Sequence, residues 1–207
     1  MKTINVKLFL ALYFSFILAT VVGTFSHECG HFLAAKYRGF DSKISYASTQ
    51  LIVSDPHKLP TEADHFFVRL GGPLQTMASG SLGLLLLFLF RRTFENTSSL
   101  QFLQWVIIFI TLFWLRQLAN LCVWYGMYFT KGSFSETGDE IGLANDLNLP
   151  YWSIITITGA MGAIVLAVVV FKFIPREQRN TFLLAGFFGG ISGYLLWLNF
   201  FGKYILP

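Results

Sequence analysis

Residues 8–35 read LFLALYFSFILATVVGTFSHECGHFLAA, and no charged side chain occurs in this run before Glu28. The hydrocarbon core of a bilayer is about 30 Å thick and is crossed by roughly 20 apolar residues in helical form. The run therefore predicts a membrane-spanning helix with ionisable side chains near its end. It is too long for a signal peptide and lacks a small-residue cleavage pattern, so we expect the mature chain to retain it.

Four more stretches are long and apolar enough to span a membrane. They are residues 66–90, 102–129, 151–174 and 181–201. Over all 207 residues, 54% are hydrophobic and 13% are charged, whereas a soluble domain carries about 25% charged residues. This composition excludes a soluble globule, a disordered chain and a disulfide-rich secreted module.

We expect an all-α integral membrane protein of about five transmembrane helices, forming one membrane-embedded domain over residues 1–207. The net charge of +4 is too small to indicate a nucleic-acid partner. With Arg116 set aside as intramembrane, the 15 basic residues leave 14, which divide seven against seven between the two sides. The positive-inside rule therefore predicts neither orientation. The expected location is a prokaryotic cell membrane, with the lipid bilayer around the helices.

Two polar segments interrupt the apolar pattern. Residues 37–65 contain β-prone runs that predict a short hairpin at the membrane face, between the first two helices. The strand near residues 43–53 could accept an extended peptide by β-augmentation, or it could simply cap the membrane face. Residues 130–150 hold four of the eleven acidic residues. We expect both segments to line a cavity that admits water.

The strongest chemical signal is the sequence His27-Glu28-Cys29-Gly30-His31. Side chains four residues apart share one face of a helix, so His27 and His31 can reach a single ion. Two imidazoles suit Zn²⁺, and Glu28 is placed to act as general base toward a metal-bound water. Ionisable residues inside a membrane helix are costly and usually functional. The motif therefore favours a zinc site over a merely polar helix end.

A catalytic zinc takes a third protein ligand and keeps one position open for water. The other histidines, His57 and His65, fall in the hairpin segment, and the acidic candidates fall in residues 130–150. The residue types alone leave the third ligand open.

Three segments resemble the site-2 protease family of intramembrane zinc metalloproteases, in particular its small multi-pass members. HECGHFLAAKYRGF (residues 27–40) is similar to the family's H-E-x-x-H motif, and LGGPLQTMASG (residues 70–80) is similar to its Gly-Pro-containing helix. Thr137-Gly138-Asp139 is similar to its Asp-bearing motif. The chain departs from the family at Gln75, where members often have Asn, and at Glu140, which replaces a Gly.

The resemblance, which covers roughly residues 10–150, implies a zinc endopeptidase that cleaves in or near the transmembrane segments of membrane-protein substrates. Residues 8–150 would form the catalytic core, and residues 151–201 would add accessory helices. The zinc ligands that the resemblance implies are His27, His31 and Asp139, with Glu140 and Asp146 as alternatives to Asp139.

Four further residues are candidates for supporting roles. Gly72 and Pro73 interrupt the second apolar stretch; they could expose backbone amides to the site, but we favour the simpler expectation that they open the helix. Arg116 and Asn120 lie one turn apart in the third stretch and share a face. They could stabilise an oxyanion or orient Asp139, or Arg116 could form a structural ion pair.

Other classes of membrane protein fit less well. A catalytically inactive scaffold of the same fold, binding membrane-protein helices without cutting them, is the main alternative. A di-iron hydroxylase would need more than the four histidines present. A transporter would show paired broken helices in two repeated halves.

Overall fold

Five helices of the described chain are long and apolar enough to cross a membrane, as the sequence predicts. The computed structural model describes residues 4–54, 57–95 and 97–207. Asn5 begins the first helix, α1 (Val6–Tyr37), by accepting a hydrogen bond from the Leu8 amide. The other helical elements are α2 (Glu62–Leu89), α3 (Arg91–Phe94), α4 (Phe102–Thr111), η1 (Leu112–Trp114), α5 (Leu115–Lys131), α6 (Asp139–Asp146), α7 (Ser153–Val168), η2 (Val169–Phe173), α8 (Arg179–Tyr194), η3 (Leu195–Phe201) and α9 (Gly202–Ile205).

The second helix, α2, starts earlier than the apolar pattern suggests. Thr61 and Asp64 form a reciprocal capping box that fixes the start at Glu62. Pro73 therefore lies inside α2, and the expectation that Gly72 and Pro73 open this helix is wrong. A cap of two polar side chains, rather than the proline, sets the boundary.

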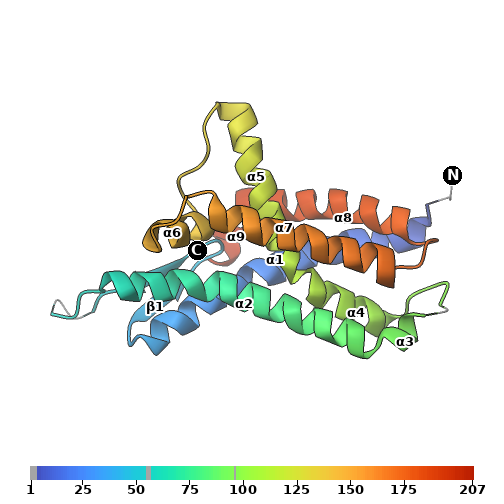
Figure 1. The fold of residues 1–207 in the computed structure, drawn as a ribbon, viewed down its shortest axis with the longest axis horizontal. Helices are drawn as coiled ribbons and strands as arrows, with labels where there is room; N and C mark the ends of the chain where they lie inside the picture. The colour runs from blue at the N-terminus through green and yellow to red at the C-terminus, as the bar shows by residue number, and fades with distance from the viewer. Residues whose placement is uncertain (1–3, 55–56, 96) are drawn as a thin grey trace.

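The third apolar stretch is not one straight helix. The 3-10 turn η1 separates α4 from α5, and α5 turns away from the long axis of the bundle (Figure 1). Gly132 adopts a left-handed conformation, with φ of 73°, and ends α5. The following segment can therefore return toward the bundle and place α6 beside α2.

The predicted hairpin is present. Strands β1 (Asp41–Ile44) and β2 (Thr49–Ile52) pair in antiparallel fashion, with Lys43 opposite Gln50. The hairpin contacts α1 and lies at the same end of the bundle as α6 (Figure 1).

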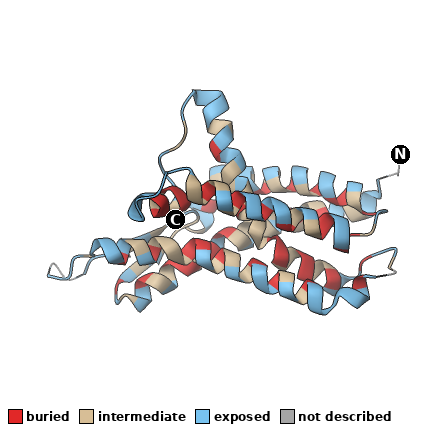
Figure 2. Cartoon of the chain, viewed as in Figure 1, coloured by how far each residue is buried: buried red, intermediate tan, exposed pale blue. Residues whose placement is uncertain are grey.

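The apolar core is formed by α1, α2, α4, α7, η2 and α8. Ile108, Val169 and Ala185 are fully buried there, and buried residues follow the inward faces of these helices (Figure 2). A second, smaller cluster of Trp124, Ile141 and Ile155 joins α5, α6 and α7. The second cluster fixes the helix that carries Asp139.

Close packing of α1 against α8 predicts opposite effects of one substitution at two adjacent glycines. A Cβ at Gly189 would lie 2.6 Å from the Tyr13 carbonyl oxygen, whereas a Cβ at Gly190 would meet nothing within 4 Å. We expect Gly189→Ala to destabilise the fold by about 1–3 kcal/mol through overpacking. We expect Gly190→Ala to be neutral or to stabilise it by up to about 1 kcal/mol, because alanine favours helix. Thermal unfolding in detergent measures both, and equal midpoints would contradict this packing.

Candidate metal centre

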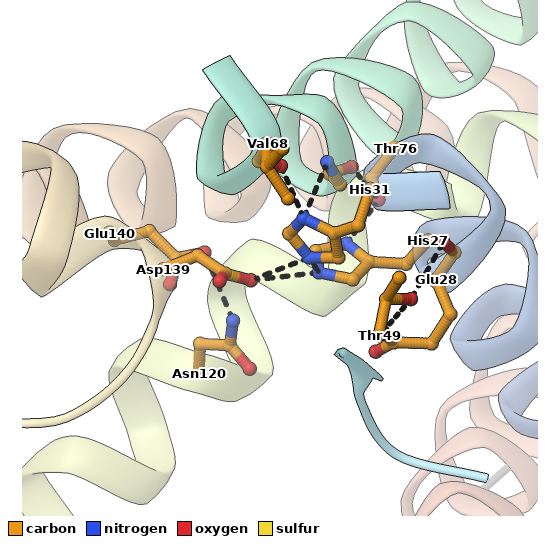
Figure 3. Close-up of polar contacts among 10 residues, drawn as sticks. His27, Glu28, His31, Thr49, Val68, Thr76, Asn120, Asp139 and Glu140 are labelled. Carbon is orange, nitrogen blue, oxygen red and sulfur yellow. Dashed lines mark hydrogen bonds and ion pairs between the residues drawn. The ribbon is translucent and has the colours of Figure 1, made fainter. Parts of the chain in front are cut away.

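Three side-chain ligand atoms converge where α1, α2 and α6 meet (Figure 3). His27 Nε2 and His31 Nε2 are 3.1 Å apart. Asp139 Oδ2 lies 2.9 Å from His27 Nε2 and 3.3 Å from His31 Nε2. His27 is fully buried, while the Asp139 side chain is 30% exposed. One face of α1 and the first turn of α6 thus supply three donor atoms to one point.

The outer nitrogen of each imidazole has a hydrogen-bond acceptor of its own. His31 Nδ1 lies 2.7 Å from the Val68 carbonyl oxygen, which can only accept, and 3.3 Å from the Gly72 amide nitrogen, which can only donate; the shorter contact assigns the hydrogen to Nδ1. His27 Nδ1 lies 2.9 Å from Thr76 Oγ1, and that hydroxyl donates its own hydrogen to the Gly72 carbonyl oxygen. Both Nε2 atoms are therefore left with lone pairs directed at Asp139. Three acceptor atoms facing one another require a cation between them, either a shared proton or a metal ion.

The separations of the three atoms fit a tetrahedral metal ion. In a zinc site with ligand bonds of about 2.0–2.1 Å, neighbouring ligand atoms lie roughly 3.3 Å apart. The observed separations of 2.9, 3.1 and 3.3 Å are at or slightly below that value. The ligand atoms of His27, Glu28 and His31 also lie within 4.8 Å of one another and could hold a metal ion. Asp139 is the better placed third donor, because its Oδ2 lies 2.9 and 3.3 Å from the two Nε2 atoms, and Glu28 already accepts a hydrogen bond from Thr49.

Glycines bring α2 against the two histidines. A Cβ at Gly30 would collide with the Gly71 carbonyl group, and a Cβ at Gly71 with that of Gly30. The backbones of α1 and α2 therefore touch at this point. Gly72 follows directly, and a Cβ added there would meet both Nε2 atoms.

Gly72→Ala is expected to block the metal position. The added methyl would lie 2.5 Å from His27 Nε2 and would also contact His31 Nε2. We expect metal affinity to fall by more than the roughly 10–100-fold that follows loss of a ligand's hydrogen-bond partner. Elemental analysis of the purified protein measures this effect. Gly126→Ala is the matched control, because a Cβ there meets nothing within 4 Å; equal metal content in both variants would contradict the prediction.

The position of Asp139 depends on the chain just before it. Gly138 has φ of 127°, a conformation that favours glycine, and α6 begins at the next residue. Trp124 Nε1 donates to the Ser135 carbonyl oxygen at 3.0 Å and holds this segment against α5. Burial alone would raise the pKa of Asp139, but its hydrogen bonds with His27 and His31 outweigh burial and lower the pKa.

Glu28 lies at the wall of a cavity of about 580 Å³. The hydroxyl of Thr49, at the start of β2, donates to Glu28, and its oxygen is 3.0 Å from both Glu28 Oε2 and the Glu28 carbonyl oxygen. Residues of the hairpin and of the segment around α6 line the same cavity. The expectation that both polar segments border one cavity is thus confirmed.

The other candidate residues lie around this centre. Asn120 donates to Glu140 Oε1 at 3.0 Å rather than to Asp139, and burial raises the pKa of Glu140. Asp146 forms an ion pair with Arg69. Successive residues of α6 point about 100° apart, so Asp139 faces the histidines while Glu140 faces α5.

Arg116 and Pro73 differ in their relation to the cavity. Arg116 lines it together with Glu28 and Asp139. Its Nε is buried without a hydrogen-bond partner, and within the described ranges it forms no ion pair. Of the two roles considered for Arg116, the described residues give no ion-pair partner for the structural one. Pro73 is buried inside α2, next to Gly72.

The sequence analysis did not predict two polar contacts of the site, that of Thr76 with His27 and that of Thr49 with Glu28. Thr76 lies four residues after Gly72, so the two share a face of α2, and this spacing could have indicated that Thr76 reaches the same site. Thr49 had no comparable signal, because nothing local shows which hairpin residue approaches α1.

No protein-family model, curated protein or solved structure matches this chain.

Proposed function

We propose that this chain is an intramembrane zinc metalloendopeptidase that hydrolyses peptide bonds in or near transmembrane segments of membrane proteins. The observation that carries the proposal is the convergence of His27 Nε2, His31 Nε2 and Asp139 Oδ2 beside the Glu28 carboxylate, at the wall of a cavity. The resemblance of the three motifs to site-2 proteases supports the same assignment. The five apolar helices support a multi-pass position in a lipid bilayer, and the proposal includes a prokaryotic cell membrane as the location.

Each residue of the centre has a defined chemical role in this reaction. His27, His31 and Asp139 would hold the zinc ion, which would supply Lewis-acid activation of water and of the substrate carbonyl group. The Glu28 carboxylate accepts a proton from the attacking water and delivers it to the leaving amine. Thr76 and the Val68 carbonyl oxygen keep both imidazoles in the tautomer that directs Nε2 inward.

The cavity also suits an extended peptide. Thr49 and Leu51 of β2 line it together with residues of α5 and α6. A substrate helix must unwind before its peptide bonds become accessible, because the helical backbone is internally hydrogen-bonded. Among the described residues, β2 pairs with β1 alone, and pairing along its other edge would stabilise the unwound segment by β-augmentation.

Metal content and cleavage together test this function. Detergent-purified wild-type protein is expected to contain about one zinc ion per chain, and His27→Ala is expected to contain none. The wild type, reconstituted in vesicles with a panel of single transmembrane helices flanked by reporter domains, should cleave some of them, and chelation should stop the cleavage. A wild type that holds zinc but cleaves no helix would contradict the protease assignment. A wild type without zinc would favour the inactive scaffold.

A further inference from the structure

The C-terminal end of the chain is hydrogen-bonded to the turn of the hairpin. The Tyr46 amide donates to the Leu206 carbonyl oxygen at 2.8 Å. In return, Trp197 Nε1 donates to the Tyr46 carbonyl oxygen at 2.8 Å. The backbone amide and carbonyl groups of Tyr46 are thus both hydrogen-bonded to residues more than 150 positions later. The C-terminus lies close to the hairpin (Figure 1).

Packing reinforces these hydrogen bonds. A Cβ at Gly202 would lie 2.7 Å from Cδ2 of the Tyr46 ring and 2.9 Å from its Cβ, so the helix backbone rests directly on this side chain. Trp197 is only 7% exposed. It lies in η3, a π-helical segment that continues from α8 into α9, and π-helical turns often occur at functional sites.

The same turn leads directly to the carboxylate proposed as the base. Ser45 closes the turn, because its amide donates to the Ser48 carbonyl oxygen at 2.8 Å. Thr49 follows, and its hydroxyl donates to Glu28. A continuous set of contacts therefore runs from Trp197 through Tyr46 and the turn to Glu28.

The hairpin needs outside support to hold this geometry. Its strands are four residues each, and an isolated two-stranded hairpin is at best marginally stable in water. α1 contacts the strands, whereas the turn is held by η3 and the residues after it. A free glutamate side chain has several rotamers, and a hydroxyl that donates to its carboxylate from a fixed position favours one of them.

We propose that the C-terminal brace, residues 197–206, holds the hairpin turn in place and thereby positions Thr49 Oγ1 on the Glu28 carboxylate. Trp197 and Thr49 are positioning residues, since they act through Glu28. The brace assigns a role to the accessory helices, which lie outside the part of the chain that resembles site-2 proteases. The consequence for catalysis rests on the proposed function, but the mechanical consequence for the hairpin does not.

Hydrogen–deuterium exchange tests the brace without any substrate. Trp197→Phe keeps an aromatic ring but removes the N–H that binds Tyr46. We expect the amides of residues 44–49 to exchange on the order of 3- to 10-fold faster in this variant, the effect of losing one hydrogen bond. Trp152→Phe is the control, because Trp152 is 51% exposed. Unchanged exchange of the hairpin in Trp197→Phe would overturn the brace.

Kinetics on fluorescein-labelled casein test the positioning of Glu28. Casein is unfolded, so its cleavage does not depend on unwinding a helix. We expect Thr49→Val to lower kcat roughly 10-fold with little change in KM or zinc content, because one hydrogen bond to a charged group is lost. Thr49→Ser keeps the hydroxyl and should restore most of kcat, and Trp197→Phe should lower kcat in the same direction as Thr49→Val.

The outcomes separate this inference from the proposed function. Equal kcat in Thr49→Ser and Thr49→Val, or an effect on KM alone, would overturn the positioning role. If the zinc-loaded wild type cleaves neither casein nor the helices, the protease assignment fails, and with it the positioning role. The exchange experiment still decides in that case whether the C-terminal residues hold the hairpin.

Discussion

Glu28→Gln is expected to retain zinc and to lose peptide-bond hydrolysis. General-base catalysis contributes on the order of 10²–10⁴-fold to a rate, so we expect a fall in kcat of that size. The amide of glutamine is nearly isosteric with the carboxylate, and its oxygen can still accept from Thr49. The change therefore removes the base while leaving the local hydrogen bond. Elemental analysis and casein cleavage on the same preparation measure both effects.

The two failures of this prediction have different meanings. Loss of zinc in Glu28→Gln would identify Glu28 as a metal ligand, which its distance from His27 and His31 permits. Full activity with zinc retained would show that another group takes the proton from water. Glu62→Gln is the matched control, since Glu62 is an exposed acid in the first turn of α2 and should leave both zinc and kcat unchanged.

The face of α1 that carries His27 and His31 was predictable because it is local. Helical periodicity alone places His27 and His31 on one face, and the structure has their Nε2 atoms 3.1 Å apart. The number of apolar helices was predictable for a similar reason, because length and composition are enough to indicate a span. The hairpin also follows from a local pattern of β-prone residues near turn residues.

The parts that the sequence did not predict depend on contacts between distant segments. The partner of Asn120 is Glu140 rather than Asp139, because the direction of each α6 side chain depends on how Ile141 packs between α5 and α7. The 3-10 turn η1 contains no proline or glycine, so the sequence gives no signal of the bend there. The contact of Trp197 with Tyr46 spans 151 positions, and no local signal could have indicated it.

The boundary of α2 shows two local signals in competition. Gly72-Pro73 indicates a helix start, and so does the Thr61/Asp64 capping box. The capping box prevails, and Pro73 remains inside the helix. The benefit at the site is that α2 is continuous past Val68 and Gly72, so one helix supplies the acceptor for His31 and the close approach to both imidazoles.

Asp139→Asn is expected to release the metal, whereas the same change at Asp146 on the same helix is expected to have no effect. Asp139 Oδ2 lies within 3.3 Å of both Nε2 atoms, while Asp146 pairs with Arg69. An amide oxygen is a neutral and weaker zinc ligand than a carboxylate. We expect the affinity of Asp139→Asn for zinc to fall well beyond the roughly 10–100-fold that loss of a ligand's hydrogen-bond partner costs.

A series of variants with different expected zinc affinities tests this assignment of the third ligand. Thr76→Val removes the acceptor of His27 Nδ1–H without removing a ligand, so its zinc affinity should fall by about 10–100-fold and lie between those of Asp139→Asn and Asp146→Asn. Competition with a calibrated chelator measures all three. If Glu140→Gln lost zinc while Asp139→Asn kept it, α6 would have to rotate on metal binding, and the third ligand would be Glu140. If all the variants kept zinc, the two histidines would be completed by Glu28 instead, which would make that residue a ligand and leave the site without the base that hydrolysis requires.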